Sequence, residues 1–372
     1  MADKKNRSVW GAVASMWHNH SYIFVFLLIL VVYAVTIQMN GRTFTPGHVS
    51  SILSSQNTVI VGTMAIGMAL VIITGQIDLS IGSALVLTTG VTVIVFNATA
   101  NIFLTVGAAL ATGLLLGTIN GVLVAYARIP PFIVTLGTML IYRSLALWAV
   151  REIPPDVSGS SSSQFAMVPG SGAYDWLRMQ FGTGSLVIAG FSIPFVSILF
   201  AACVVLFVFI AHNTKYGKAV FAVGSNAKAA RLSGVNTQRI QASVFMVTGL
   251  LVGVASIIQA SKVGNITPAS SGRAYEMYAI AAVVLGGIAM AGGRGNMLGV
   301  LFGVLSYATI DFIIVSIPAL SADIQDTFQG LVLILVILVQ TAGPAVRDRF
   351  QQWRRHLRPE PSVKEAEPVS AG

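Results

Sequence analysis

Long apolar stretches alternate with short polar or glycine-containing breaks along most of this chain. Several stretches approach about 20 residues, the length that an α-helix needs to cross a hydrocarbon core of roughly 30 Å. Dividing the pattern at glycine, proline and charged positions predicts ten spanning helices. The predicted ranges are 21–39, 57–74, 82–97, 102–126, 132–150, 193–212, 242–260, 277–292, 296–316 and 327–343.

The composition agrees with a membrane protein. Hydrophobic residues make up 55% and charged residues 9% of the 372 positions, whereas soluble domains carry about 25% charged residues. The apolar stretches lack the even alternation of a membrane β-barrel. In lipid, each backbone N–H and C=O must be satisfied within its own segment, which a helix achieves. The sequence therefore predicts an all-α, polytopic membrane protein with about ten transmembrane helices.

The basic residues predict the orientation in the membrane. The net charge is +9, but lysine and arginine lie between apolar stretches and at both ends rather than in one nucleic-acid-binding patch. If the N-terminus is inside, the inner loops hold most of them, as the positive-inside rule expects. All of the basic loops and both basic ends lie on the inner side only if the number of spans is even. We therefore expect both termini to be cytoplasmic and no nucleic-acid partner.

The same pattern divides the chain into segments. Residues 1–20 form a cytoplasmic N-terminal segment, 21–343 the transmembrane domain, and 344–372 a polar cytoplasmic tail that we expect to be disordered. The long outer loop, 151–192, is either an interfacial segment that caps the outer mouth or a passive loop on the headgroups. The single cysteine, Cys203, excludes a disulfide within one chain and a multi-thiolate metal site.

The stretch TGQIDLSIGSA, Thr74–Ala84, holds the only formally charged side chain of residues 43–127. A charge at the bilayer centre costs roughly 2.5–3.5 kcal/mol on insertion scales. Gly75 loosens the end of the preceding helix, and Asp78 or Ser80 can cap the next helix. We predict a break that places polar groups inside the membrane, as in transporters; a cap in a short cytoplasmic turn is the alternative. No second carboxylate or histidine lies nearby, so catalysis is not expected.

The largest inner loop, 213–241, carries five lysines or arginines and no acidic residue. Asn226 is a good N-cap, the following AKAARLS favours a short helix, and Gly234 is a natural residue just beyond a helix end. A two-turn helix has too little apolar surface to be stable alone. We therefore expect it to dock on a partner, and a loop that only sets the topology is the alternative.

Two further charges, Arg143 and Asp311, fall inside predicted spans, toward their outer halves. Arg143 is expected either to reach the interface by snorkelling or to pair with Asp311 across the bundle. The GGRG of Gly292–Gly295 lacks the pattern of a phosphate-binding loop and a preceding strand, so nucleotide binding by this chain is not expected. A tight inner turn is the better interpretation.

Four stretches, in sequence order, carry a family resemblance: IGMALVIITGQIDLSIGS, RIPPFIVTLGTMLIYRS, YGKAVFAVGSNAKAARLSGV and YEMYAIAAVVLGGIAMAGGRGNMLGVLFG. They closely resemble the permease subunits of bacterial monosaccharide ABC importers, a family that includes ribose, xylose, galactose and multiple-sugar systems. The resemblance covers residues 43–343. It departs at Gln76, where a glycine is common, at Tyr278, where an acidic or amide residue is common, and at Asp311, where an asparagine is frequent.

The resemblance implies an inner-membrane permease, one half of a homodimer or heterodimer, that moves a pentose or hexose by alternating access. Its partners would be cytoplasmic ATPase subunits and a periplasmic or lipid-anchored sugar-binding protein. No cofactor is expected on this chain, because ATP and Mg would bind the partner ATPase. The segment 224–235 matches the family's coupling helix, and the candidate coupling residues are Asn226, Ala229, Ala230, Arg231 and Gly234.

Candidates for the sugar pathway come from two sources. Gln76, Asp78 and Ser80 lie where the resembling family has a glycine, aspartate and serine pattern. Others are chosen for polarity and position alone: Asn120, Thr135, Thr138 and Tyr142. The alternatives are a secondary transporter driven by an ion gradient, with Asp78 or Asp311 as the ion site, and an integral-membrane enzyme. The enzyme is disfavoured because the spans and loops show no convincing histidine or carboxylate cluster.

Overall fold

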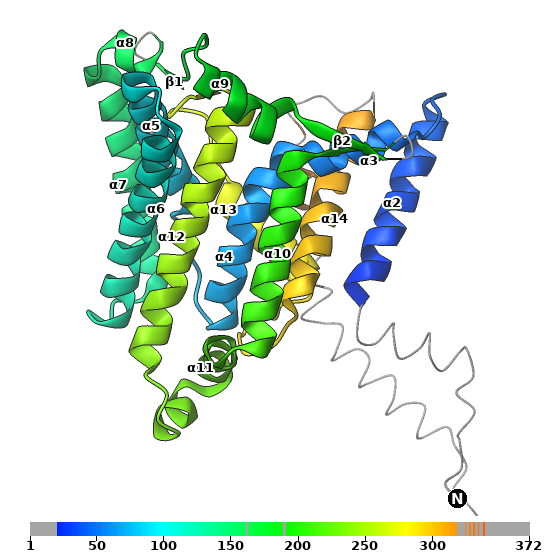
Figure 1. The fold of residues 1–372 in the computed structure, drawn as a ribbon. Coiled ribbons are helices and arrows are strands. Elements are labelled where there is room, and N and C mark those ends of the chain that lie inside the picture. Colours follow the sequence, from blue (N-terminus) through cyan, green and yellow to red (C-terminus); the bar gives the residue numbers. More distant parts are fainter. Residues whose placement is uncertain are drawn as a thin grey trace, which may run out of the picture.

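The computed structural model describes residues 21–160, 163–188 and 191–317, together with isolated positions between 324 and 338. Figure 1 shows long helices lying side by side. Within the described residues, seven helices are long and apolar enough to cross a membrane, and a pair bent by 49° makes up to eight. The seven are α2 (Ser21–Met39), α5 (Ile81–Thr99), α6 (Ile102–Ala125), α7 (Pro131–Glu152), α10 (Phe195–Asn213), α12 (Thr237–Lys262) and α14 (Met297–Ser316).

The bent pair joins α3 (Pro46–Ser54) to the continuous run of the π-turn η1 (Asn57–Val61) and α4 (Gly62–Ile73). Every residue of α4 is buried, and α4 contacts α10, α12, α13 and α14. Its sequence is apolar on all sides, as expected of a helix enclosed by others. Figure 1 places α4 near the middle of the bundle, where it can contact several neighbours at once.

The outer loop predicted at 151–192 is largely structured. It contains α8 (Pro155–Ser158), α9 (Gly172–Leu177), the π-turn η2 (Arg178–Thr183), β1 (Phe165–Ala166) and a hairpin of β2 (Ser185–Ile188) and β3 (Phe191–Pro194). Strand β1 pairs with β4 (Asn265–Ile266), α8 contacts α5, and η2 contacts α10 and α12. The segment therefore packs on the ends of the helices, which favours the capping alternative over a passive loop.

The inner loop also contains more helix than expected. Helix α11 (Lys215–Leu232) includes a stretch before Asn226 that the sequence analysis treated as loop. Asn226 itself leaves the helical conformation (φ −163°, ψ 97°), and its Oδ1 accepts a hydrogen bond from Ala229 N–H at 2.9 Å. Gly234 has a φ of +86° and closes the end by donating to Arg231 O. The predicted short helix and its two ends are therefore present after the kink.

Two of the ten predicted spans are not observed as spanning helices in the described residues. The range 277–292 is wrong as a spanning helix: α13 (Tyr275–Leu285) has 11 residues, about 16 Å at 1.5 Å per residue, and glycines with positive φ follow it at 287, 292 and 293. The range 327–343 lies largely outside the described residues, as do 1–20 and 344–372. The count of ten spans and the side of each terminus therefore stay predictions.

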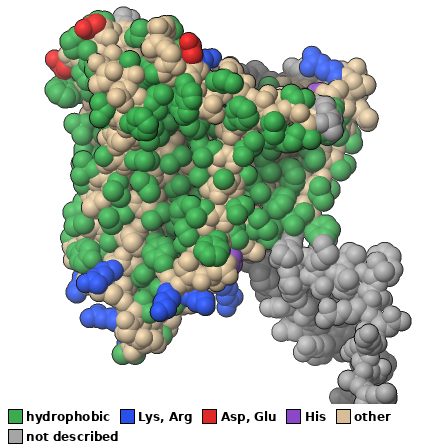
Figure 2. Space-filling model, in the orientation of Figure 1, with side chains coloured by type: hydrophobic (Ala, Val, Ile, Leu, Met, Phe, Trp, Pro, Cys, Tyr) green, Lys and Arg blue, Asp and Glu red, His purple; other side chains and the backbone are tan. Residues whose placement is uncertain are grey.

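The charged side chains lie at the two ends of the bundle. Figure 2 shows lysine and arginine gathered near α11, at the lower end, and acidic side chains at the opposite end. The broad middle is covered by hydrophobic side chains on the face shown. This distribution matches a multi-pass membrane protein, and on the face shown more lysine and arginine lie at the α11 end than at the opposite end.

Candidate functional site

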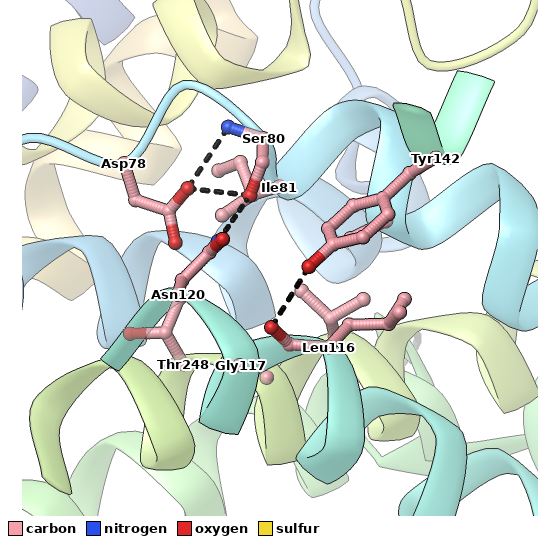
Figure 3. Close-up of a pocket in the computed structure, with 11 residues that line it drawn as sticks. Asp78, Ser80, Ile81, Leu116, Gly117, Asn120, Tyr142 and Thr248 are labelled. Atoms are coloured by element: carbon pink, nitrogen blue, oxygen red, sulfur yellow. Dashed lines mark hydrogen bonds between the residues drawn. The ribbon is translucent and has the colours of Figure 1, made fainter. Parts of the chain in front are cut away.

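The predicted break between two helices is present at Thr74–Ser80. Helix α4 ends at Ile73, Gly75 takes a φ of +77°, and α5 begins at Ile81. The Oδ1 atom of Asp78 accepts hydrogen bonds from Ser80 N–H at 2.9 Å and from Ser80 Oγ at 2.7 Å (Figure 3). Asp78 thus forms a turn with Ser80 just before α5. Ser80 is the N-cap residue of α5, and no side chain accepts a capping hydrogen bond there, so the predicted side-chain cap is not observed. Asp78 is 2% exposed.

Side chains from two other helices complete the cluster. Asn120 of α6 donates from Nδ2 to Ser80 Oγ at 2.8 Å, and Tyr142 of α7 donates to Leu116 O at 3.0 Å (Figure 3). All of these polar side chains are buried. Within the described residues, Asn120 Oδ1 has no hydrogen-bond partner. The structure thus brings together four pathway candidates from separate parts of the sequence: Asp78, Ser80, Asn120 and Tyr142.

The cavity that these four residues share is small. Its volume is about 10 Å³, and Thr248 and Gly249 of α12 complete the lining. A cavity of this size holds about one water molecule, so it cannot hold a sugar in this conformation. The cluster therefore fastens the start of α5 to α6, and Asn120 Oδ1 offers an acceptor to a single small donor.

The other pathway candidates lie apart from this cavity. Gln76 lines a different one, of about 390 Å³, together with Arg128 and Arg231. Thr135 Oγ1 lies 3.5 Å from Ile77 O and donates to Pro131 O at 2.9 Å. Thr138 Oγ1 donates to Val134 O within its own helix. Gln76 belongs to the broken segment itself, and Thr135 lies beside the carbonyl group of Ile77 in that segment.

The broken segment is also joined to the inner loop. Ile73 O, the last carbonyl of α4, accepts a hydrogen bond from Gly293 N–H at 2.8 Å. Gly224 of α11 packs against the same carbonyl so closely that a methyl group there would overlap it. Ser225 Oγ then donates to Gly293 O at 3.3 Å. The residues just before the Asn226 kink therefore contact the end of α4 directly.

The two charges expected to pair have separate partners in the described part of the chain. Arg143 Nη1 donates to Pro268 O at 2.9 Å and to Ser271 O at 2.5 Å. Asp311 Oδ2 accepts from Asn57 Nδ2 at 3.1 Å. These contacts give no support to the predicted pairing, because the Arg143 bonds run to the turn before α13.

The sequence analysis missed an acidic group that lines the same cavity as Arg143. Glu276, in the first turn of α13, lines a third cavity with Arg143, Arg273 and Ser83. A signal was present, because Glu276 is the only acidic residue between Asp175 and Asp311. The sequence analysis included Glu276 only within a family motif. The two residues lie far apart in the sequence, so the sequence does not indicate that they line one cavity.

Membrane-crossing helices that enclose a broken helix and a buried polar cluster define a polytopic membrane protein of the transport class. Residues 50–337 match the family described as the branched-chain amino acid transport system / permease component, and the chain belongs to this family. No solved structure gave a match.

Curated relatives match most of the chain. The ribose import permease protein of Escherichia coli (strain K12) is 33% identical over 313 residues, which is 84% of this chain and 91% of that protein. The ribose import permease protein of Haemophilus influenzae is 32% identical, over 84% and 90% of the two chains. The xylose transport system permease protein of Escherichia coli (strain K12) is 30% identical, over 86% and 92%. The chain is similar to sugar import permeases over nearly their whole length.

Proposed function

We propose that this chain is the membrane permease subunit of an ATP-driven importer that carries a monosaccharide, a pentose or a hexose, across a bacterial inner membrane. The ribose and xylose permeases among its relatives support the substrate class. The chain itself forms the passage and hydrolyses nothing. A second permease chain, cytoplasmic ATPase subunits with ATP and Mg, and an outer sugar-binding protein complete the importer.

One observation carries the mechanism: the residues just before the Asn226 kink, which lead into the short helix, contact the end of α4 directly. The exposed residues of the short helix include Ala229, Arg231 and Leu232, the last with 82% of its surface exposed. Such an exposed leucine on a basic inner surface suits docking on another protein. On the other side of the kink, Gly224 packs on Ile73 O, where α4 ends.

This connection supports the alternating-access mechanism that we propose. Closure of the ATPase subunits would move α11, and the contact of Gly224 with Ile73 O would pass the movement to the end of α4. Residues 76–80 form no helix and are the natural place to bend. Sugar would be held weakly, because a tight site in the passage would slow its release.

The docking role is tested with the complete importer in liposomes. Replacing both Ala229 and Arg231 with glutamate should lower sugar-stimulated ATP hydrolysis about tenfold or more, since loss of a docking hot spot costs at least about 1–2 kcal/mol. Lys218→Glu changes the charge of an exposed residue on the same helix, before the kink, and should have a much smaller effect. Equal losses in both variants would contradict specific docking.

The energy source is tested separately. Purified chain, reconstituted without any ATPase subunit, should not accumulate labelled ribose or xylose against a gradient of protons or sodium ions. Accumulation under these conditions would overturn the proposal and favour an ion-driven secondary transporter.

A further inference from the structure

A third cavity, distinct from the two described around the broken segment, opens between α5, α7 and the start of α13. Its volume is about 230 Å³, and its lining includes Ser83, Leu140, Arg143, Arg273 and Glu276. Drug-sized ligands occupy pockets of roughly 300–1,000 Å³, so this cavity suits a smaller molecule. Glu276 lies at the end of α13 opposite to the Gly293 junction, which places the cavity in the outer half of the bundle.

Arg143 is held in place at this cavity. Its Nη1 donates to Pro268 O and Ser271 O, so the turn before α13 fixes the guanidinium. Arginine has five N–H donors, and these two bonds leave further donors for a molecule in the cavity that Arg143 lines. A fixed guanidinium loses little conformational entropy when it forms such bonds.

Glu276 lies close to α5. A methyl group at Gly82 would come within 2.7 Å of Glu276 Oε2 and would also overlap Gly272 O. The absence of a side chain at Gly82 therefore gives the carboxylate room beside the first turn of α5. Glu276 and Arg143 line the same cavity and attract each other electrostatically.

The combination of groups indicates the kind of ligand. A carboxylate accepts hydrogen bonds from hydroxyl groups, a guanidinium donates to hydroxyl oxygens, and Leu140 offers apolar surface at the mouth. Arg143, Arg273 and Glu276 place both donors and acceptors in one small cavity, as a molecule with several hydroxyl groups requires. A monosaccharide has these groups, together with C–H surface for the leucine.

The place of this cavity in the fold supports the same ligand. The eight residues from Gln76 to Ser83 contact all three cavities in sequence order. Ser83 lines the outer one, Asp78 and Ser80 line the small one, and Gln76 lines the one beside Arg231. Movement of this segment would therefore change the wall of the outer cavity.

We propose that the cavity lined by Ser83, Arg143 and Glu276 is a monosaccharide-binding site on the outer half of the passage. The proposal rests on the proposed function, because it assigns residues to the substrate of that passage. Arg143 and Glu276 bind hydroxyl groups of the sugar, and the first turn of α5 separates it from the broken segment below.

The first experiment measures uptake of labelled D-ribose, D-xylose and D-galactose by the complete importer in liposomes. Leu140→Trp should narrow the cavity mouth and lower uptake of the transported sugar about tenfold, as expected when about 1.4 kcal/mol of binding is lost. Leu145→Trp is the matched control, because Leu145 is an exposed leucine on the same helix that does not line this cavity. Glu276→Gln, which keeps the size of the side chain, should lower uptake in the same direction.

The second experiment measures binding without transport. In a Cys203→Ala background, Leu140→Cys and the control Asp156→Cys, at an exposed position of α8 outside the spanning helices, are labelled with a membrane-impermeant thiol reagent. The transported sugar should slow labelling at 140 but not at 156, and Glu276→Gln should remove this protection.

The outcomes separate the two proposals. If the unmodified importer takes up none of the three sugars with ATP, the proposed function fails. If it takes up a sugar but labelling at 140 is unprotected, or Leu140→Trp transports as well as Leu145→Trp, the binding site is overturned while the proposed function stands.

Discussion

At the scale of single residues, Asp78 shows how a carboxylate is accommodated in an apolar bundle. It accepts two hydrogen bonds from Ser80, and Ser80 Oγ in turn accepts one from Asn120. A hydrogen bond to a charged group contributes about 1.5–3 kcal/mol, and a buried donor left without its partner costs about 1–3 kcal/mol. Asp78 therefore fastens the break, whether or not substrate passes beside it.

Asp78→Ala should lower the stability of the purified protein by about 1–3 kcal/mol, because Ser80 N–H loses its acceptor. Asp78→Asn keeps an acceptor oxygen and should cost less. Thermal unfolding in detergent measures both. Asp156→Ala, at an exposed outer position, should stay within about 0.5 kcal/mol of the unmodified protein. Equal melting temperatures for Asp78→Ala and Asp156→Ala would show that the hydrogen bonds of Asp78 contribute nothing to stability.

At the scale of elements, glycines set how closely the helices pack. Gly113 and Gly117 of α6 lie against Gly249 and Gly253 of α12, with backbone atoms in direct contact. Small residues permit such approach, and helix packing in membranes relies on it because lipid is as apolar as the side chains. The α6–α12 pair in turn supplies Asn120 and Thr248 to the small cavity.

Gly117→Val should destabilise the protein by about 1–3 kcal/mol or more, because the added atoms have no room. A Cβ there would lie 2.9 Å from Gly249 Cα and still closer to Phe245 O. Gly107→Val is the matched control on the same helix, since nothing lies within 4 Å of a Cβ at that position. Resistance to unfolding in detergent distinguishes them, and similar values would argue against close packing of α6 and α12.

At the scale of the whole molecule, the inner junction joins three distant parts of the chain. Ile73 O accepts from Gly293 N–H, Ser225 Oγ donates to Gly293 O, and Gly224 packs on Ile73 O. The proposed movement of the ATPase subunits would reach α4 through this junction, because α11 contacts the end of α4 here. We therefore expect the residues after Asn226 to dock on the ATPase subunits and the residues before it to pass the movement to α4.

Gly224→Ala should impair the transmission of movement to α4 without impairing docking. The added methyl group would overlap Ile73 O, so transport should fall about tenfold if the contact is worth about 1.4 kcal/mol to the switch. The ATPase subunits should still co-purify, because the docking residues lie beyond Asn226. Gly137→Ala, where nothing lies within 4 Å of the added Cβ, should transport normally. Loss of co-purification in Gly224→Ala would mean that the junction supports docking instead.

The sequence by itself determined the local features of this protein. Length and apolarity predicted α2, α5, α6, α7, α10 and α14 close to their observed bounds, because in lipid a continuous apolar stretch has no alternative to the helix. The break at Asp78 and the helix that Asn226 caps were also predicted, because these turn and cap hydrogen bonds run to backbone groups two or three residues away.

Only the tertiary structure decided which polar groups meet. Arg143 was expected to reach lipid headgroups or Asp311, yet it bonds to the turn before α13 and shares a cavity with Glu276. Thr138 and Tyr142 look equally polar in sequence, but one bonds within its helix and the other reaches α6. Such contacts join residues far apart in the chain, and their choice depends on how the helices rotate and pack. Periodicity within one helix carries no information about this.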